Sequence, residues 1–171
     1  MRKLLRYAAM LVPGVAWTVP LFTQLHKRYP CLGTTALHGL GLGLLLAAAC
    51  AAVFFATGGP HLRRRGSPAL AYAGIVVASI VSGTLWAPCL NALLDFGPKA
   101  TIDGEVEEIS NPGKGNPNRR VIAEVDGEKR EGTFYAHDNF WHVPAVREGG
   151  SVRLTVGPGL FGVPWIARFE G

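Results

Sequence analysis

The first 94 residues of this chain contain no aspartate or glutamate. Residues 1–97 carry eight lysine and arginine residues against Asp95 alone, whereas residues 98–171 carry nine basic and eleven acidic residues. The net charge of +5 for the whole chain therefore arises in the N-terminal part. Because the C-terminal part has no basic excess, we expect it not to bind the phosphate backbone of a nucleic acid.

Several kinds of catalytic sequence are also missing. The chain has no Gly-x-Ser-x-Gly elbow, no phosphate-binding loop and no His-Glu-x-x-His motif, and residues 98–171 have no cysteine. The adjacent Glu107 and Glu108 lie on a predicted strand, where neighbouring side chains point to opposite faces, so we expect no paired-acid site. We therefore predict that the chain is not an enzyme and holds no cofactor.

Three long apolar runs dominate the N-terminal part. Residues 4–25, 32–57 and 69–94 carry no charged side chain except Arg6. Each run reaches the roughly 20 residues that a helix needs to cross a bilayer. We predict a transmembrane unit over residues 1–97. The first run could instead be a cleaved signal peptide, but its length and the lack of a small-x-small cleavage site favour an uncleaved helix.

The short loops beside these runs predict the topology. Arg2, Lys3 and Arg6 share one side with the run 63–65, while Lys27 and Arg28 lie on the other side. Lysine and arginine are more frequent in cytoplasmic loops. We predict a multi-pass protein of a bacterial inner membrane, with a cytoplasmic N-terminus and an extracytoplasmic C-terminal domain.

Small residues and prolines mark the predicted helices. Prolines 13 and 20 should bend the first helix, and neighbouring groups should satisfy the carbonyls that they free. Small residues four apart favour close helix packing, either within one chain or in a dimer. We expect the second and third helices to meet through two rows, Gly39 with Gly43, and Gly74 with Ala78 and Ser82.

The three cysteines all belong to the N-terminal part. Cys50 lies in the middle of the second run, where we expect inert packing. Cys31 and Cys89 lie near the outer ends of two helices under the predicted topology. A disulfide between them is possible in an oxidising compartment.

Residues 98–171 show the alternation of a small all-β domain. The turn Asp126-Gly127 is a strong hairpin signal. Pro164 lies within the last predicted strand and places it at an edge or a bulge. We predict a five-stranded barrel, closed or half-closed, of the OB-like or SH3-like kind. Its strands are Ala100–Ser110, Arg120–Val125, Glu128–Tyr135, Ser151–Val156 and Leu160–Phe169.

Turn glycines and alternating valines of this region carry a resemblance. The pattern is Gly104-x-Val106, Val125-Asp126-Gly127, Gly150-x-Val152-x-Leu154, Gly159–Gly162 and Ile166. It resembles uncharacterised bacterial inner-membrane proteins with two or three helices and a small all-β domain of unknown function. More loosely, it resembles the OB-like tail of NfeD-type membrane proteins. The resemblance implies no activity.

The densest polar cluster lies between the third and fourth predicted strands and comprises His137, Asp138, Phe140, Trp141 and His142. Aromatic side chains are favoured anchors at protein interfaces, so we interpret this cluster as an interaction surface. The alternative is a metal-dependent or hydrolytic site at the two histidines and the aspartate, although their spacing matches no strong zinc pattern.

These observations together predict an accessory role at a membrane. We expect an integral inner-membrane protein that displays a small β domain for protein–protein contact, in quality control or as an immunity-type protein. Its expected partners are the lipid bilayer and either another protein or further copies of the chain. One histidine, His38, and no acidic residue within the apolar runs make a poor proton relay, so transport by this chain alone is not expected.

Overall fold

The computed structural model describes residues 1–23, 25, 28–57, 67–110, 118–135 and 146–171. Its described residues divide by their contacts into two compact units. The helical unit comprises residues 1–24 and 36–87, and the strand unit comprises residues 25–35 and 88–171. The strand unit therefore includes the connection before the second predicted span and the last turns of the third. Both segments lie before residue 98, where the sequence predicted the start of the strand domain.

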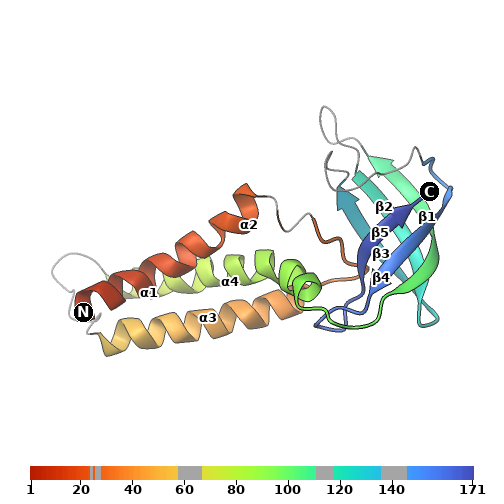
Figure 1. Ribbon diagram of the computed structural model, residues 1–171. Coiled ribbons are helices and arrows are strands. Elements are labelled where there is room, and N and C mark those ends of the chain that lie inside the picture. The colour runs from red at the N-terminus through yellow and green to blue at the C-terminus, as the bar shows by residue number, and fades with distance from the viewer. Residues whose placement is uncertain (24, 26–27, 58–66, 111–117, 136–145) are drawn as a thin grey trace. The chain divides into compact units, whose positions relative to one another are not determined.

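Three helical stretches are long and apolar enough to cross a membrane, as the sequence predicted. They are Arg2–Phe22, Ala36–Ala56 and Ala69–Leu93. The first stretch is divided into α1 (Arg2–Ala16) and α2 (Thr18–Phe22), while α3 (Ala36–Ala56) and α4 (Pro68–Leu93) form the others (Figure 1). Most of their side chains are not buried inside the protein, which fits helices whose apolar faces meet lipid.

The break between α1 and α2 follows from proline chemistry. Pro20 has no N–H, so it cannot bond the carbonyl of Ala16, four residues earlier. The indole Nε1 of Trp86 donates to that carbonyl at 2.8 Å. Ser82 Oγ likewise donates to the carbonyl of Pro13 at 2.9 Å. The prediction that neighbouring helices satisfy the freed carbonyls is confirmed for Pro20. It stays a prediction for the carbonyl of Ala9, which Pro13 frees.

The glycines of α3 allow its backbone to approach α4 closely. A Cβ added at Gly43 would lie 2.6 Å from Ile80 Cα, and one at Gly39 would lie 2.7 Å from Thr84 Cα. On α4, Gly83 faces the backbone of these two glycines. Gly39 and Gly43 therefore pack against α4 of the same chain. The α4 surface that they meet is shifted by one residue from the predicted row, which is a rotation of about 100° around the helix.

The predicted α4 row has other surroundings. A Cβ at Gly74 would meet nothing within 4 Å. Ser82 is buried and bonds α1. Ala78 is half-buried. Small residues at four-residue spacing indicated that α4 packs closely, but the helix carries several such rows and only the packing selects one of them.

The strand unit contains one antiparallel sheet of five strands (Figure 1). The order in the sheet is β3-β2-β1-β4-β5. The strands match the predicted ones closely, except that the last begins only after Pro164 and lies at an edge, as proline requires. Their bounds are β1 (Ala100–Ser110), β2 (Asn118–Val125), β3 (Glu128–Tyr135), β4 (Ser151–Gly157) and β5 (Trp165–Glu170).

Sequence alternation explains which face of the sheet is buried. The predicted β2–β3 turn is confirmed, because Asp126 and Gly127 both have positive φ, at 53° and 78°. One residue of the core comes from far outside the strands, because Leu32 is completely buried among them. The core comprises Leu32, Val106, Val121, Ala123, Val152, Leu154, Val156, Ile166 and Phe169.

Candidate functional site

A β-bulge in β1 changes the outer face of the sheet. The pairing of β1 with β2 shifts between Val106 and Glu108, so Glu107 is an extra residue on β1. Val106 is buried, whereas Glu107 and Glu108 are both exposed. The expectation that these glutamates point to opposite faces was therefore wrong. Strict alternation ends where a bulge inserts a residue, and nothing in the local sequence announced it.

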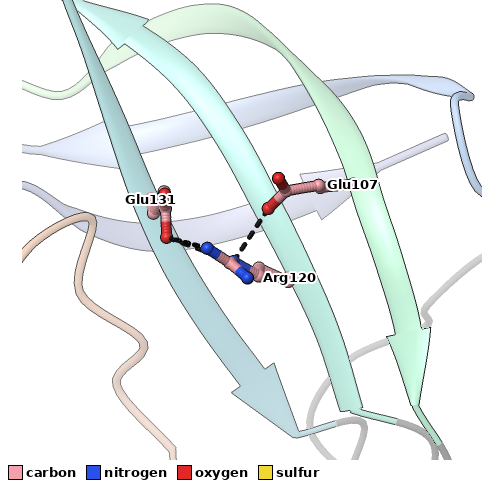
Figure 2. Close-up of polar contacts among 3 residues, drawn as sticks. All are labelled: Glu107, Arg120 and Glu131. Atoms are coloured by element: carbon pink, nitrogen blue, oxygen red, sulfur yellow. Dashed lines mark hydrogen bonds and ion pairs between the residues drawn. The ribbon is translucent and has the colours of Figure 1, made fainter.

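Arg120 of β2 lies between two of the carboxylates on this face (Figure 2). Its Nη2 is 2.6 Å from Oε2 of Glu131 on β3, and its Nε is 2.8 Å from Oε2 of Glu107 on β1. The hydrogen bonds that Arg120 donates to Glu131, and the negative charge of Glu107, raise the pKa of Arg120 above its usual value. Because all three side chains are well exposed, these ion pairs contribute little to stability.

Next to this cluster lies a shallow open groove of about 400 Å³. Its charged lining residues are Asp103 and Glu105 of β1, Glu124 of β2 and Lys129 of β3. Three carboxylates therefore line the groove with one ammonium group, and Oδ1 of Asp103 also lies 3.8 Å from Nε of Arg153 on β4. Across residues 100–110 and 118–135, eight acidic residues accompany four basic ones. This acidic outer face, comprising the groove and the Arg120 cluster, suits a positively charged segment of a partner.

Asn91 joins the strand unit to the last turn of α4. Its side chain is fully buried, with Nδ2 donating to the carbonyl of Val163 at 2.7 Å and Oδ1 accepting from the amide of Phe161 at 3.0 Å. The amide of Leu160 donates to the carbonyl of Asn91 at 3.0 Å. A Cβ at Gly159 would lie 2.6 Å from the Asn91 side-chain amide, so this close approach needs glycine.

Asp95 and Trp165 form a second link near the same end of α4. The indole Nε1 of Trp165 donates to Oδ2 of Asp95 at 2.6 Å, and the amide of Gly97 donates to its Oδ1 at 2.9 Å. Partial burial alone would raise the pKa of Asp95, but these hydrogen bonds outweigh it and hold the pKa below its usual value. Lys99 Nζ lies 5.3 Å from the Trp165 ring centroid.

The segment before α3 contributes to the sheet region. Cys31 forms a bridge with Trp165 of β5, and the amide of Leu32 donates to the carbonyl of Pro164 at 2.7 Å. A Cβ at Gly132 of β3 would lie 2.8 Å from the carbonyl oxygen of Cys31. The segment therefore lies beside both edge strands.

The three cysteines, all within the described residues, carry thiols rather than disulfides. Burial raises the pKa of the Cys31 thiol to about 11, although a hydrogen bond from Asn91 opposes the rise. The Cys31–Cys89 disulfide stays a prediction.

Arg119 is a buried cation at the start of β2. In the described part of the chain, its Nε and Nη1 have no hydrogen-bond partner. Burial lowers its pKa below the usual value, yet an arginine stays charged. The sequence did not single out Arg119, because its position on β2 resembles that of any charged strand residue.

The predicted interaction cluster, His137, Asp138, Phe140, Trp141 and His142, lies outside the described residues. The alternative metal-dependent or hydrolytic site falls on the same residues. Elsewhere, in the described ranges, no group of three histidine, cysteine or acidic side chains is placed to hold a metal ion.

Sequence reasoning did not identify Asn91 or the outer-face cluster. A signal for Asn91 existed, because it is the one amide side chain in the apolar run 69–94, where a polar group needs a partner. Comparison of the chain with models of protein families, with curated proteins and with solved structures gave no match.

Proposed function

We propose that this chain is an integral inner-membrane protein that presents the acidic outer face of its strand unit to a positively charged protein partner. The observation that carries the proposal is the exposed Glu107–Arg120–Glu131 cluster beside a groove with three carboxylates. Oriented charges on an exposed sheet face steer a partner of opposite charge and fix its register. No catalysis is part of this proposal.

The proposed orientation rests on loop charges. With three spans, residues 25–35 and 94–171 lie on one side of the membrane, while the N-terminus and residues 63–65 lie on the other. The larger number of arginine and lysine residues near the N-terminal side supports a cytoplasmic N-terminus and an extracytoplasmic strand unit. A soluble protein outside the membrane, or a neighbouring membrane protein, would then meet the outer face.

We also infer that the strand unit is a half-closed barrel. The support is the segment 30–32, which bonds β5 and lies against Gly132 of β3. Its carbonyl at Pro30 accepts from the amide of Ile166 at 2.8 Å. Such a segment would protect an edge strand from pairing with other chains. The partner would then meet the outer face and not a free edge.

Site-specific photo-crosslinking in native membranes tests the proposed function. A benzoylphenylalanine at Thr133, which pairs with Arg120 across the sheet, should give an adduct of discrete mass. The same probe at Arg168 of β5 is the matched control, because this side chain is also exposed. Equal adducts from both positions, or none from Thr133, would contradict the proposal.

Charge variants then test the chemistry of the partner. Replacing Glu107 and Glu131 by glutamine keeps the size of both side chains but removes two negative charges. We expect the Thr133 adduct to fall by about tenfold, corresponding to about 1.4 kcal/mol of binding. Replacing Glu148 and Glu170 by glutamine measures the effect of negative charge elsewhere on the unit, because neither residue lines the groove or pairs with Arg120. An unchanged adduct after the first replacement would show that the outer-face charges do not recruit the partner.

A further inference from the structure

The connection between β4 and β5 is unusually apolar for a hairpin loop. Residues 154–167 contain no aspartate, glutamate, lysine or arginine. At the tip, Leu160 is 49 % exposed. Loops of soluble sheets are usually polar because they face water. The loop therefore presents an uncharged surface with a half-exposed leucine at its tip.

The hydrogen bonds of Asn91 fix the depth of this loop. Asn91 lies two residues before Leu93, the last residue of a candidate membrane span. A helix rises about 1.5 Å per residue, so Asn91 is about 3 Å from the end of that span. The backbone of residues 160, 161 and 163 bonds Asn91 directly. The loop tip is thus held level with the last turn of α4.

The residues around this junction have the composition of a membrane interface. Leu93, at the end of α4, is 49 % exposed, and Phe96, just beyond it, is 90 % exposed. Tyr29 and Lys99 lie at the same end, over the buried Trp165: the Tyr29 ring meets the Trp165 ring edge-on at 5.9 Å, and Lys99 Nζ is 5.3 Å from its centroid. Tyrosine and lysine are common anchors where helices leave the hydrocarbon core. The loop and the helix end therefore share one environment.

We propose that the β4–β5 loop, residues 158–164, is a membrane-contacting element, with Leu160 inserted at the boundary between headgroups and acyl chains. The occupant of this apolar surface is lipid, because the loop is continuous through Asn91 with a helix that crosses the bilayer. The contact would hold the strand unit against the membrane surface. This proposal requires that α4 crosses the membrane, and it does not depend on the protein partner proposed above.

A fluorescent probe at residue 160 tests this contact. The full chain carrying Leu160→Cys is labelled with an environment-sensitive dye and placed in phosphatidylcholine–phosphatidylglycerol vesicles at high lipid-to-protein ratio. Unaltered protein gives the background, which should be low because Cys50 and Cys89 are buried and the Cys31 thiol rarely ionises at neutral pH. We expect quenching of roughly twofold or more by lipid spin-labelled near the glycerol backbone, and little quenching by aqueous iodide.

Two matched positions make the result decisive. A label at Phe96→Cys, beside the span, should behave like the label at residue 160. A label at Glu107→Cys, on the outer face, should be quenched by iodide and not by lipid. Strong iodide quenching at residue 160 would overturn the proposal. Shielding from both quenchers would also overturn it, since protein and not lipid would then cover the loop. Each variant is folded if its elution volume and circular dichroism spectrum agree with those of the wild type.

Discussion

Two leucines five residues apart show how differently the two units of this chain treat apolar side chains. Leu37 in α3 is 75 % exposed, whereas Leu32 is completely buried in the core of the strand unit. Helices that meet lipid can leave leucine on their surface at no cost, whereas a sheet unit in water must bury it. The exposed fraction of an apolar side chain therefore indicates whether lipid or water is expected around its unit.

The largest expected effect tests this contrast directly. Leu32→Ala should destabilise the strand unit by about 2–5 kcal/mol, because it removes buried methyl groups and leaves a cavity among the other eight core residues. Leu37→Ala should change stability by less than about 0.5 kcal/mol in detergent. Thermal unfolding of the full chain in a mild detergent, followed by near-ultraviolet circular dichroism, measures both. Equal effects would mean that the two leucines share one environment.

Helix packing should show a similarly large contrast. Gly43→Ala places a Cβ 2.6 Å from Ile80 Cα, so the backbones of α3 and α4 must separate. We expect a loss of about 1–3 kcal/mol, as for other overpacked sites. Gly41→Ala is the matched control, since a Cβ there meets nothing within 4 Å. Unfolding in detergent should separate the two variants, and a tolerated Gly43→Ala would contradict the close approach.

Asn91→Ala should uncouple the β4–β5 loop from α4. It removes the hydrogen bonds that Asn91 makes with the amide of Phe161 and the carbonyl of Val163, at a cost of about 1–3 kcal/mol. Thr84→Ala is the control on the same helix, because the Thr84 hydroxyl is exposed and donates to the carbonyl of Ile80 in that helix. Hydrogen exchange in detergent should show faster exchange at residues 160–163 in Asn91→Ala alone. Unchanged exchange there would show that the loop keeps its position without Asn91.

The pH dependence of the strand unit should include Asp95. Its pKa in the folded chain lies below the ordinary value of 3.8, so the folded state favours the carboxylate. The stabilisation is complete above that ordinary value and is lost as the pH falls through the lower pKa of the folded state. In Asp95→Asn, the unfolding temperature should fall less steeply as the pH is lowered through this range. If it falls as steeply as in wild type, other carboxylates cause the loss of stability.

The smallest expected effect concerns the outer face. Arg120→Ala should leave the unfolding temperature nearly unchanged, because exposed ion pairs contribute little to stability. The same variant should weaken the Thr133 crosslink, since it leaves Glu107 and Glu131 unpaired and misplaced. Stability and crosslinking, measured on one preparation, separate recognition from folding. A large loss of stability would mean that the cluster has a structural role.

Sequence reasoning reached most of the fold but little of the candidate site. Apolar runs and strand alternation are local patterns, so they located the three helices and the five strands within a few residues. The bulge at Glu107 and the burial of Leu32 depend on which strands meet, and no local pattern encodes that. The predicted barrel and interaction loop remain proposals, because they rest on strand closure and on residues outside the described ranges.

The sequence by itself determined the division of this chain into a part with three apolar runs long enough to cross a membrane and a polar, strand-rich part, because the run length and charge of each segment depend only on composition. Tertiary structure alone decided that Asn91, Asp95 and the segment before α3 bind the strand unit to the end of a span. Hydrogen bonds between residues about 70 positions apart form only when folding brings their atoms within 3 Å, as between Asn91 and Phe161.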